Sequence, residues 1–387
     1  MVLHEVVTVL VLALLDLVNF NLHSELQLEF QLLQLLLVVI YQLLFLKLKV
    51  GLEVVNFIHE RLFLLVGFIY VGPVGDGGWT HAHDSGRKAL EEAGHKSYFV
   101  ESVPEGASEG QILKIARKSD IIFTTSFGFM DPTLKVSKKF PDKVFFHCSG
   151  FKQSKNMGNY FGRMYQAKYL AAIIAGGMSK KGRIGIVGSQ PIPEIIRHIN
   201  AITLGAQQSN PNIEVEVLWI NSWFDPAKES DAAQALIDNG ADVIVTMADS
   251  PATVQTSKKN GVYAIGNDTD MAIYGKEAHL TAAVWNWDVY YLAAVKAVEN
   301  GTWKSSADWW GLDSGIVGLT SFHPDVPQSL IVQMNREKGR ILSGTMDVFD
   351  HGFTKRDGTR VTKALNDGEM LGMMYYVKGI ISKIPSG

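Results

Sequence analysis

The feature that most constrains the fold is a regular alternation of short apolar runs with segments of helical periodicity, which begins at Val66. Such alternation predicts βαβ units with right-handed crossovers and a mostly parallel sheet. The first strands are predicted at Val66–Val71, Ser97–Glu101, Ile121–Thr125 and Val144–Cys148, with helices around Thr80–Ala93, Ser108–Lys118 and Pro132–Lys139 between them.

The same alternation restarts after a long apolar helix predicted at Arg163–Met178. Two such runs predict an α/β protein of two doubly wound lobes, residues 65–181 and 182–284, with return segments from about 285–387 shared between them. Lobes joined by several crossings form a hinged clamp with a ligand in its cleft. The predicted strands are Arg183–Gly188, Glu214–Ile220, Asp242–Thr246, Val262–Gly266 and Leu280–Val284; the predicted helices are Glu194–Gln208, Ala227–Asn239, Pro251–Lys259, Val289–Asn300, Ser329–Leu342 and Met370–Ile381.

The first 64 residues do not continue this pattern. They are dominated by Leu and Val, and no Lys or Arg precedes Lys47, so the order of features in a secretory signal is missing. Charged residues such as Asp16, Glu25 and Glu29 interrupt any stretch long enough to span a membrane. Residues 1–64 are therefore expected to be an extension outside the fold, with a membrane anchor as the alternative.

Bulk properties exclude several classes of protein. A formal net charge of -3 provides no broad basic surface for nucleic acid. The single cysteine, Cys148, allows no internal disulfide and is expected to be a buried, inert thiol. His81 and His83 stand without further His or Cys nearby, which favours solvated or capping roles over metal binding. No catalytic motif is present, so neither an enzyme nor a cofactor is expected.

The loops that follow the predicted strands share an unusual composition. Each pairs an aromatic residue or a glycine with a carboxylate or amide, and in an open α/β sheet these loops meet at one crevice. Aromatic faces and carboxylates together suit a flat, nitrogen-rich ring, whereas the scarcity of Lys and Arg argues against a phosphate. The loops read GDGGWTHAHD, SFGFMDP, NSWFDP, GNDTD and WNWD.

Simpler interpretations of these residues remain open. Asp131 and Asp225 each precede a proline and are equally well explained as helix N-caps. Trp79 or Trp223, taken singly, is more often part of a core or a lid than a platform for a ligand. Their joint placement on opposite lobes favours the functional interpretation.

Several longer motifs in one order resemble the basic membrane protein family of ABC-transporter substrate-binding proteins, which includes purine nucleoside receptors. They are GDGGWT, FGFMDP, FGRMYQAKYLAAIIAG, KKGRIGIVGS, INAITLGAQQSNP, NSWFDPAKE, NGADVIV and YAIGNDTD, and they run from about residue 65 to the mid-330s. The resemblance implies a type I periplasmic-binding-protein fold with a multi-strand hinge. It also implies a purine held between Trp79 and Trp223, with Asp131, Asp268 and Asp270 as its acidic contacts. Gly78 and Phe129, in the same loops, complete the implied site.

One position departs from the family pattern. Nucleoside-binding members carry a ribose-binding lysine where this chain has Trp285, followed by Asn286. An indole there should shrink or close the ribose pocket, which favours a free base such as adenine over a nucleoside. The resemblance further implies a monomeric periplasmic or cell-surface protein that delivers its ligand to a permease and its ATPase.

Three other functions stay open at this point. They are a nucleoside-binding protein of the same family, a purine-processing enzyme, and a ligand-sensing regulator. A regulator would need a DNA-binding or signalling domain, and the first 65 residues lack the turn chemistry and basic face for one.

Overall fold

The computed structural model describes helical residues 33, 35–38, 40–42 and 44–49 and residues 64–350 and 352–385. The chain divides into two units, residues 1–63 and Leu64–Gly387, and every strand that the structure describes belongs to the second unit. The prediction that residues 1–64 form an extension falls largely outside the described residues. Among the residues described, no helix is long and apolar enough to cross a membrane.

The first sheet has six parallel strands in the order β11-β5-β4-β3-β1-β2. Its central strands β1 and β3 are apolar and almost wholly buried, as strands covered by helices on both faces must be. The elements of this run are β1 (Leu65–Ile69), α3 (Trp79–Glu92), β2 (Lys96–Val100), η1 (Glu105–Ala107), α4 (Ser108–Ala116), β3 (Ile121–Thr124), η2 (Phe127–Phe129), α5 (Met130–Ser137), β4 (Val144–Cys148) and β5 (Met157–Gly162).

The second sheet repeats this topology, with the order β12-β10-β9-β8-β6-β7 and only β12 antiparallel to its neighbour β10. In each sheet the strand order reverses between the first strand and the third of its run, which is where an open α/β sheet binds ligands. Its elements are α6 (Met164–Met178), β6 (Arg183–Gly188), α7 (Pro193–Ser209), β7 (Glu214–Trp219), α8 (Pro226–Asp238), β8 (Val243–Met247), α9 (Ala252–Lys259), β9 (Tyr263–Asp268), α10 (Ala272–Gly275) and β10 (His279–Trp285).

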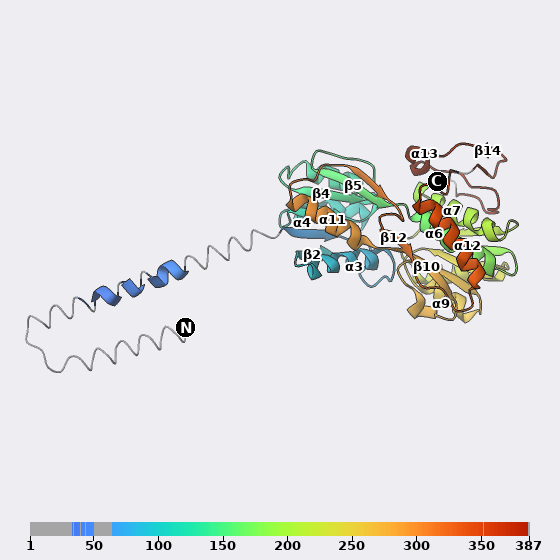
Figure 1. Cartoon of the computed structure of the whole chain (residues 1–387), viewed down its shortest axis with the longest axis horizontal. Coiled ribbons are helices and arrows are strands. Elements are labelled where there is room, and N and C mark those ends of the chain that lie inside the picture. Colours follow the sequence, from blue (N-terminus) through green and yellow to red (C-terminus); the bar gives the residue numbers. More distant parts are fainter. Residues whose placement is uncertain are drawn as a thin grey trace, which may run out of the picture. The chain divides into compact units, whose positions relative to one another are not determined.

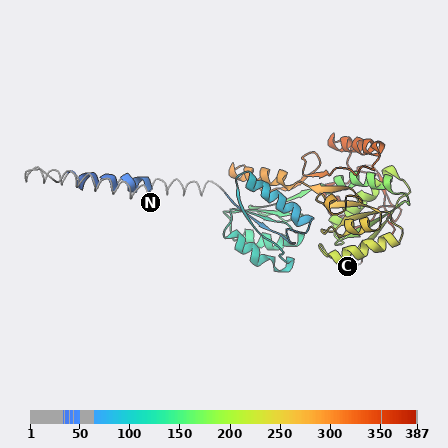
Figure 2. The same cartoon turned by 90° about the horizontal axis from the view of Figure 1, so that it is seen from below.

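The chain passes between the two sheets three times, after β5, after β10 and after β11. Figures 1 and 2 show the two lobes that result, with α3 and α11 in one and α6, α7 and α12 in the other. These later elements are α11 (Trp287–Glu299), β11 (Ala307–Trp310), β12 (Val317–Leu319) and α12 (Gln328–Leu342).

Helices α6 and α7 pack closely in the second lobe, and glycines permit the contact. A Cβ on Gly205 would lie 2.1 Å from the Tyr169 carbonyl oxygen, and one on Gly176 would lie 2.3 Å from that of Ala206. Helix α6 is buried almost all round, which explains its mostly apolar sequence. Helix α6 of this pair also packs against β9, β10 and β12 of the second sheet.

The C-terminal segment contradicts one sequence prediction. Only the short α13 (Asp367–Leu371) is helical where a helix near Met370–Ile381 was expected. Beyond it the chain runs beside β7 as an extra strand-like edge, with the Val215 amide donating to Gly379 and the Ile381 amide donating to Val215, each at 2.9 Å. Two of the apolar residues that suggested a helix, Val377 and Ile380, are instead buried in this irregular segment. A small hairpin lies beside it, formed by β13 (Phe353–Thr354) and β14 (Arg360–Val361).

Most of the other predicted elements are confirmed within one or two residues. Among the strands of the two six-stranded sheets, the sequence patterns missed β5, β11 and β12. Strand β5 reads MGNYFG and β11 reads ADWW, so neither carries the β-branched run that marks a strand. Pairing with neighbouring strands, rather than local propensity, makes them strands.

Candidate ligand-binding site

A partly enclosed cavity, with about 530 Å³ of empty space that includes open solvent, lies where the carboxyl ends of the two sheets face each other. Residues of the first lobe that line it are Val71, Trp79, Ser126, Phe127 and Ser149. Those of the second lobe are Glu194, Ile195, His198, Trp223, Met247, Asp249, Asn267, Asp268 and Trp285. Its mixture of aromatic walls with a few polar groups is that of a small-molecule site.

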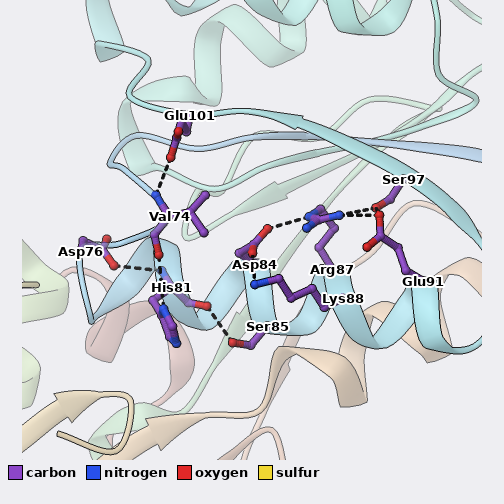
Figure 3. A network of polar contacts seen from close by, with 10 residues as sticks. All are labelled: Val74, Asp76, His81, Asp84, Ser85, Arg87, Lys88, Glu91, Ser97 and Glu101. Atoms are coloured by element: carbon purple, nitrogen blue, oxygen red, sulfur yellow. Dashed lines mark hydrogen bonds and ion pairs between the residues drawn. The ribbon is translucent and has the colours of Figure 1, made fainter. Parts of the chain in front are cut away.

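Asp76 fixes the turn that carries Trp79. Its carboxylate accepts hydrogen bonds from the backbone amides of Gly78, Thr80 and His81, at 2.9, 2.8 and 2.9 Å, and so caps the first turn of α3. Figure 3 shows this turn, where the Val74 amide is also held by Glu101 and the His81 ring lies against the Val74 carbonyl. The aspartate of the GDGG motif is therefore structural, and its effect is to set where Trp79 begins the helix.

Further along α3, charged side chains around the buried pair Asp84 and Arg87 tie the helix together and to β2. Arg87 donates to Asp84 at 2.6 Å and to Glu91 at 2.6 Å, and Lys88 also pairs with Asp84 (Figure 3). Arg87 also donates to the Ser97 hydroxyl of β2 at 2.9 Å. The helix that carries Trp79 is thus fixed against the sheet.

The Trp79 ring is held by its own polar group and by aromatic neighbours. Its Nε1 donates to the Thr125 carbonyl at 2.6 Å. The ring meets Trp285, Trp287 and His83 with ring centroids 5.7, 5.7 and 4.4 Å away, all near perpendicular. These contacts leave little freedom to the indole, so it presents a fixed surface to the cavity.

Trp223 lies on the second lobe, in the loop between β7 and α8, and it is half-buried in the cavity wall. The loop ends at Asp225, whose side chain accepts from the Lys228 amide at 3.1 Å and caps α8. The N-cap interpretation of Asp225 is therefore confirmed. The Trp223 carbonyl accepts from the Asp249 amide at 3.0 Å, which joins this loop to the end of β8.

A buried polar network forms one wall of the cavity. Asp268, in the left-handed region with φ 66°, accepts from Trp285 Nε1 at 2.8 Å and from Asn267 Nδ2 at 2.8 Å. The Asn267 side-chain oxygen in turn accepts from the Lys168 ammonium. Burial lowers the pKa of Lys168 to about 8 and raises the pKa of Asp268 above its ordinary value, with each opposing the other's shift.

Sequence reasoning missed three titratable residues of the cavity and the buried Lys168 behind it. Glu194 and His198 lie one turn apart on α7, and Asp249 follows β8. Burial raises the pKa of Glu194 to about 7 and the pKa of Asp249 well above its ordinary value, while burial lowers the pKa of His198. Helical spacing of Glu194 and His198 on one face was the available signal; Lys168 was hidden in an apolar helix.

The structure brings four of the nine sequence-predicted site residues to this cavity: Trp79, Trp223, Asp268 and Trp285. Asp270 and Asn286 instead line a neighbouring hollow of about 810 Å³, which shares Asp268 and Trp285 with the first cavity. Asn286 donates to the Gly315 carbonyl there at 2.8 Å.

Asp131, Phe129 and Gly78 do not line either hollow. Asp131 lies within α5 rather than at its N-cap, with a side chain 67% exposed and paired to Lys152 at 2.5 Å. Phe129 is fully buried in the core, and Phe127 reaches the cavity instead. The 3₁₀ turn η2 explains the exchange, because residues two apart in such a turn point in different directions.

Two other predictions have clear outcomes. Cys148 is free and buried, as expected. His83 is not solvated: it is fully buried, stacks on Trp287 at 4.4 Å and shares a 2.5 Å hydrogen bond with Tyr291. Among the described residues, no group of three or more His, Cys, Asp or Glu could hold a metal ion.

Comparison with known proteins adds independent information. The family model described as "ABC transporter substrate-binding protein PnrA-like" (Bmp) matches residues 63–350. A purine-binding protein of Brucella abortus (strain 2308) is 46% identical over 335 residues, which are 84% of this chain and 95% of that protein. A Haloferax volcanii protein, provisionally named an ABC transporter glucose-binding protein, is 34% identical over 322 residues, 82% of this chain and 81% of that one.

Solved structures agree on the fold. A solute-binding protein from Aeropyrum pernix K1 aligns with TM-score 0.66 and 18% identity over 73% of this chain and 92% of its own. One from Conexibacter woesei DSM 14684 aligns with TM-score 0.62 and 22% identity over 73% of this chain and 98% of its own. The fold is therefore the type I periplasmic-binding-protein fold that the sequence predicted, and this chain belongs to the Bmp family of PnrA-like ABC transporter substrate-binding proteins.

Proposed function

We propose that this substrate-binding protein carries a purine, with a free base such as adenine favoured over a nucleoside. The observation that carries the proposal is the position of Trp79 and Trp223, which line one cavity from opposite lobes. Stacking on aromatic faces stabilises a bound base by about 1–3 kcal/mol for each base. The purine-binding name of the Brucella relative, at 46% identity, supports the same class of ligand.

The polar groups of the cavity suit a base rather than a phosphate or a sulfate. Glu194, Asp249 and Asp268 line it, and no Lys or Arg is among the lining residues. Carboxylates accept hydrogen bonds from ring N–H and exocyclic amino groups, and the charge makes those bonds about twice as strong as neutral ones. An anionic ligand would instead face three acidic groups.

The preference for a free base rests on Trp285. Its indole is 6% exposed, stacks on Trp287 with ring centroids 4.5 Å apart, and donates to Asp268. A ring fixed by a stack and a hydrogen bond cannot move aside at low cost to admit a sugar. Ribose would have to displace it or break the network with Asp268.

One observation favours a second candidate, a nucleoside. The hollow of about 810 Å³ beside the cavity shares Asp268 and Trp285 with it and is lined by the polar residues Thr269, Asp270 and Asn286. A ribose that projected past Trp285 would find hydrogen-bonding groups there.

Isothermal titration with adenine, adenosine and D-glucose tests the proposal. We expect adenine to bind and adenosine to bind at least about tenfold more weakly, since one lost or strained contact is worth about 1.4 kcal/mol. Tighter binding of adenosine would favour the nucleoside candidate. Binding of glucose without any purine would overturn the proposal.

The partners of the protein are those of its family. Substrate-binding proteins of ABC transporters deliver their ligand to a permease that is driven by an ATPase, and they do not catalyse a reaction. We place this chain in the periplasm or at the cell surface, as a monomer in which the ligand stabilises the closed arrangement of the lobes.

A further inference from the structure

The carboxylates near the cavity differ in how many hydrogen bonds they accept from the protein itself. Asp76 accepts three backbone amides at the start of α3. One carboxylate oxygen of Asp268 accepts a hydrogen bond from Trp285, and the other accepts one from Asn267. Both are therefore committed to holding the site together.

Asp249 differs from these two, because its carboxylate, like that of Glu194 on α7, accepts no hydrogen bond from any residue that the structure describes. It lines the cavity and is only 5% exposed. A buried carboxylate without a donor is costly, and the acidic neighbours Asp76, Asp268, Glu229 and Glu194 raise that cost. The cavity therefore lacks the donor that this carboxylate needs, and a ligand with N–H groups would supply it.

Asp249 also lies at the point where the two lobes touch. A Cβ on Gly78 would lie 2.5 Å from the Asp249 carbonyl oxygen and 2.7 Å from its Cα, so only glycine allows this approach. One residue earlier, the Gly77 carbonyl accepts from the Thr269 hydroxyl. The GDGG turn of the first lobe thus rests on the second lobe beside Asp249, and it carries Trp79 immediately after.

We infer that Asp249 is a ligand-binding residue that determines specificity by accepting an N–H of the bound purine, and that the Gly78 contact is what brings Trp79 and Asp249 to the ligand together. This inference rests on the proposed function. According to this inference, Gly77 and Gly78 contribute to closure of the two lobes and do not contact the ligand directly. The inference also explains why the GDGG turn lies so close to Asp249 at the end of β8.

The first test is titration of wild type, Asp249→Asn and the control Asp231→Asn, an exposed carboxylate on α8. The ligands are adenine, purine, which lacks the 6-amino group, and 9-methyladenine, which lacks the N9 proton. Asp249→Asn should weaken adenine binding about 10- to 100-fold, as expected for one charge-assisted hydrogen bond. Wild type should prefer adenine over at least one analogue, and that preference should collapse in Asp249→Asn but persist in Asp231→Asn.

Each outcome has a distinct meaning. If wild type binds no purine, the proposed function fails and the inference with it. If wild type binds adenine and Asp249→Asn keeps the same affinity, or keeps wild-type discrimination against both analogues, the inference alone is overturned.

A second pair of variants covers the case in which Asp249→Asn does not fold. Gly78→Ala should raise the dissociation rate of adenine at least about tenfold, because its Cβ would collide with Asp249 when the lobes meet. Gly75→Ala is the matched control, since a Cβ there meets nothing within 4 Å. Equal dissociation rates for the two variants would overturn the role of the Gly78 contact.

Discussion

At the scale of single residues, Trp79 and Trp223 differ in how extensively they contact the rest of the protein. Trp79 contacts four aromatic rings and donates to the Thr125 carbonyl, whereas Trp223 sits in a surface loop with its side chain only half-buried. Truncation at the two positions should therefore separate ligand binding from stability.

Trp223→Ala should weaken adenine binding about 5- to 150-fold, the loss of one stacking face, while the melting temperature without ligand stays close to wild type. Trp79→Ala should weaken binding as much and also lower that melting temperature, since it leaves a cavity against Trp285 and Trp287. Titration and thermal unfolding of both variants check this. A Trp223→Ala protein that binds adenine normally would contradict the stacking role.

Glu194 provides a second test at this scale, through pH. Burial raises its pKa to about 7 from an ordinary 4.5, so between these values the folded protein holds a proton that the unfolded chain has released. Its contribution to stability is therefore full below the lower value and falls as the pH rises toward the higher one. Relative to wild type, Glu194→Gln should gain melting temperature on going from pH 5 to pH 8.

Comparing each variant with wild type at the same pH removes the common contributions of the buried histidines. Glu92→Gln, an exposed carboxylate at the end of α3, is the control and should give a constant difference from wild type. A constant difference for Glu194→Gln as well would contradict the buried, raised pKa.

At the scale of elements, the local sequence pattern predicted most helices and strands, because buried strands read as short apolar runs and helices repeat apolar residues every three to four positions. It failed where pairing between distant segments of the chain, and not the local sequence, determines the secondary structure. Strand β5 has no apolar run of its own, and the C-terminal segment reads as a helix but pairs with β7. Composition of the loops predicted an aromatic and acidic site, yet η2 places Phe127 rather than Phe129 in the cavity.

The C-terminal edge gives a prediction with a neighbouring control. Ile380 is 2% exposed and packs in the main core, whereas Ile381 is 40% exposed. Ile380→Ala should lower the free energy of unfolding by about 2–5 kcal/mol, and Ile381→Ala should change it by less than about 1 kcal/mol. Urea unfolding of both variants would measure this; equal, small losses would mean that the segment does not stabilise the second lobe.

At the scale of the whole molecule, the repeated strand order explains why one cavity has two similar walls. Each sheet reverses its strand order beside its first strand, so each lobe offers its binding loops at one edge. The sequence predicted this pair of lobes from repetition. It could not predict which loop residues meet across them, because Gly78 and Asp249 are brought together only by the approach of the lobes.

The sequence also could not show which acidic residue of the second lobe is available to a ligand. Asp268 and Asp270 stood out in the GNDTD motif, but Asp268 is occupied by Trp285 and Asn267, and Asp270 faces the neighbouring hollow. Asp249, in the segment TMADSP, carries a carboxylate that accepts no hydrogen bond within the part of the chain that the structure describes. Hydrogen-bond partners, which only the structure supplies, distinguish the three.

The most direct test of the central claim is a crystal structure of the protein with adenine bound. We predict that the ring is stacked between Trp79 and Trp223, with an N–H directed at Asp249 and Trp285 still bonded to Asp268. Adenine bound outside this cavity, or stacked against neither tryptophan, would contradict it.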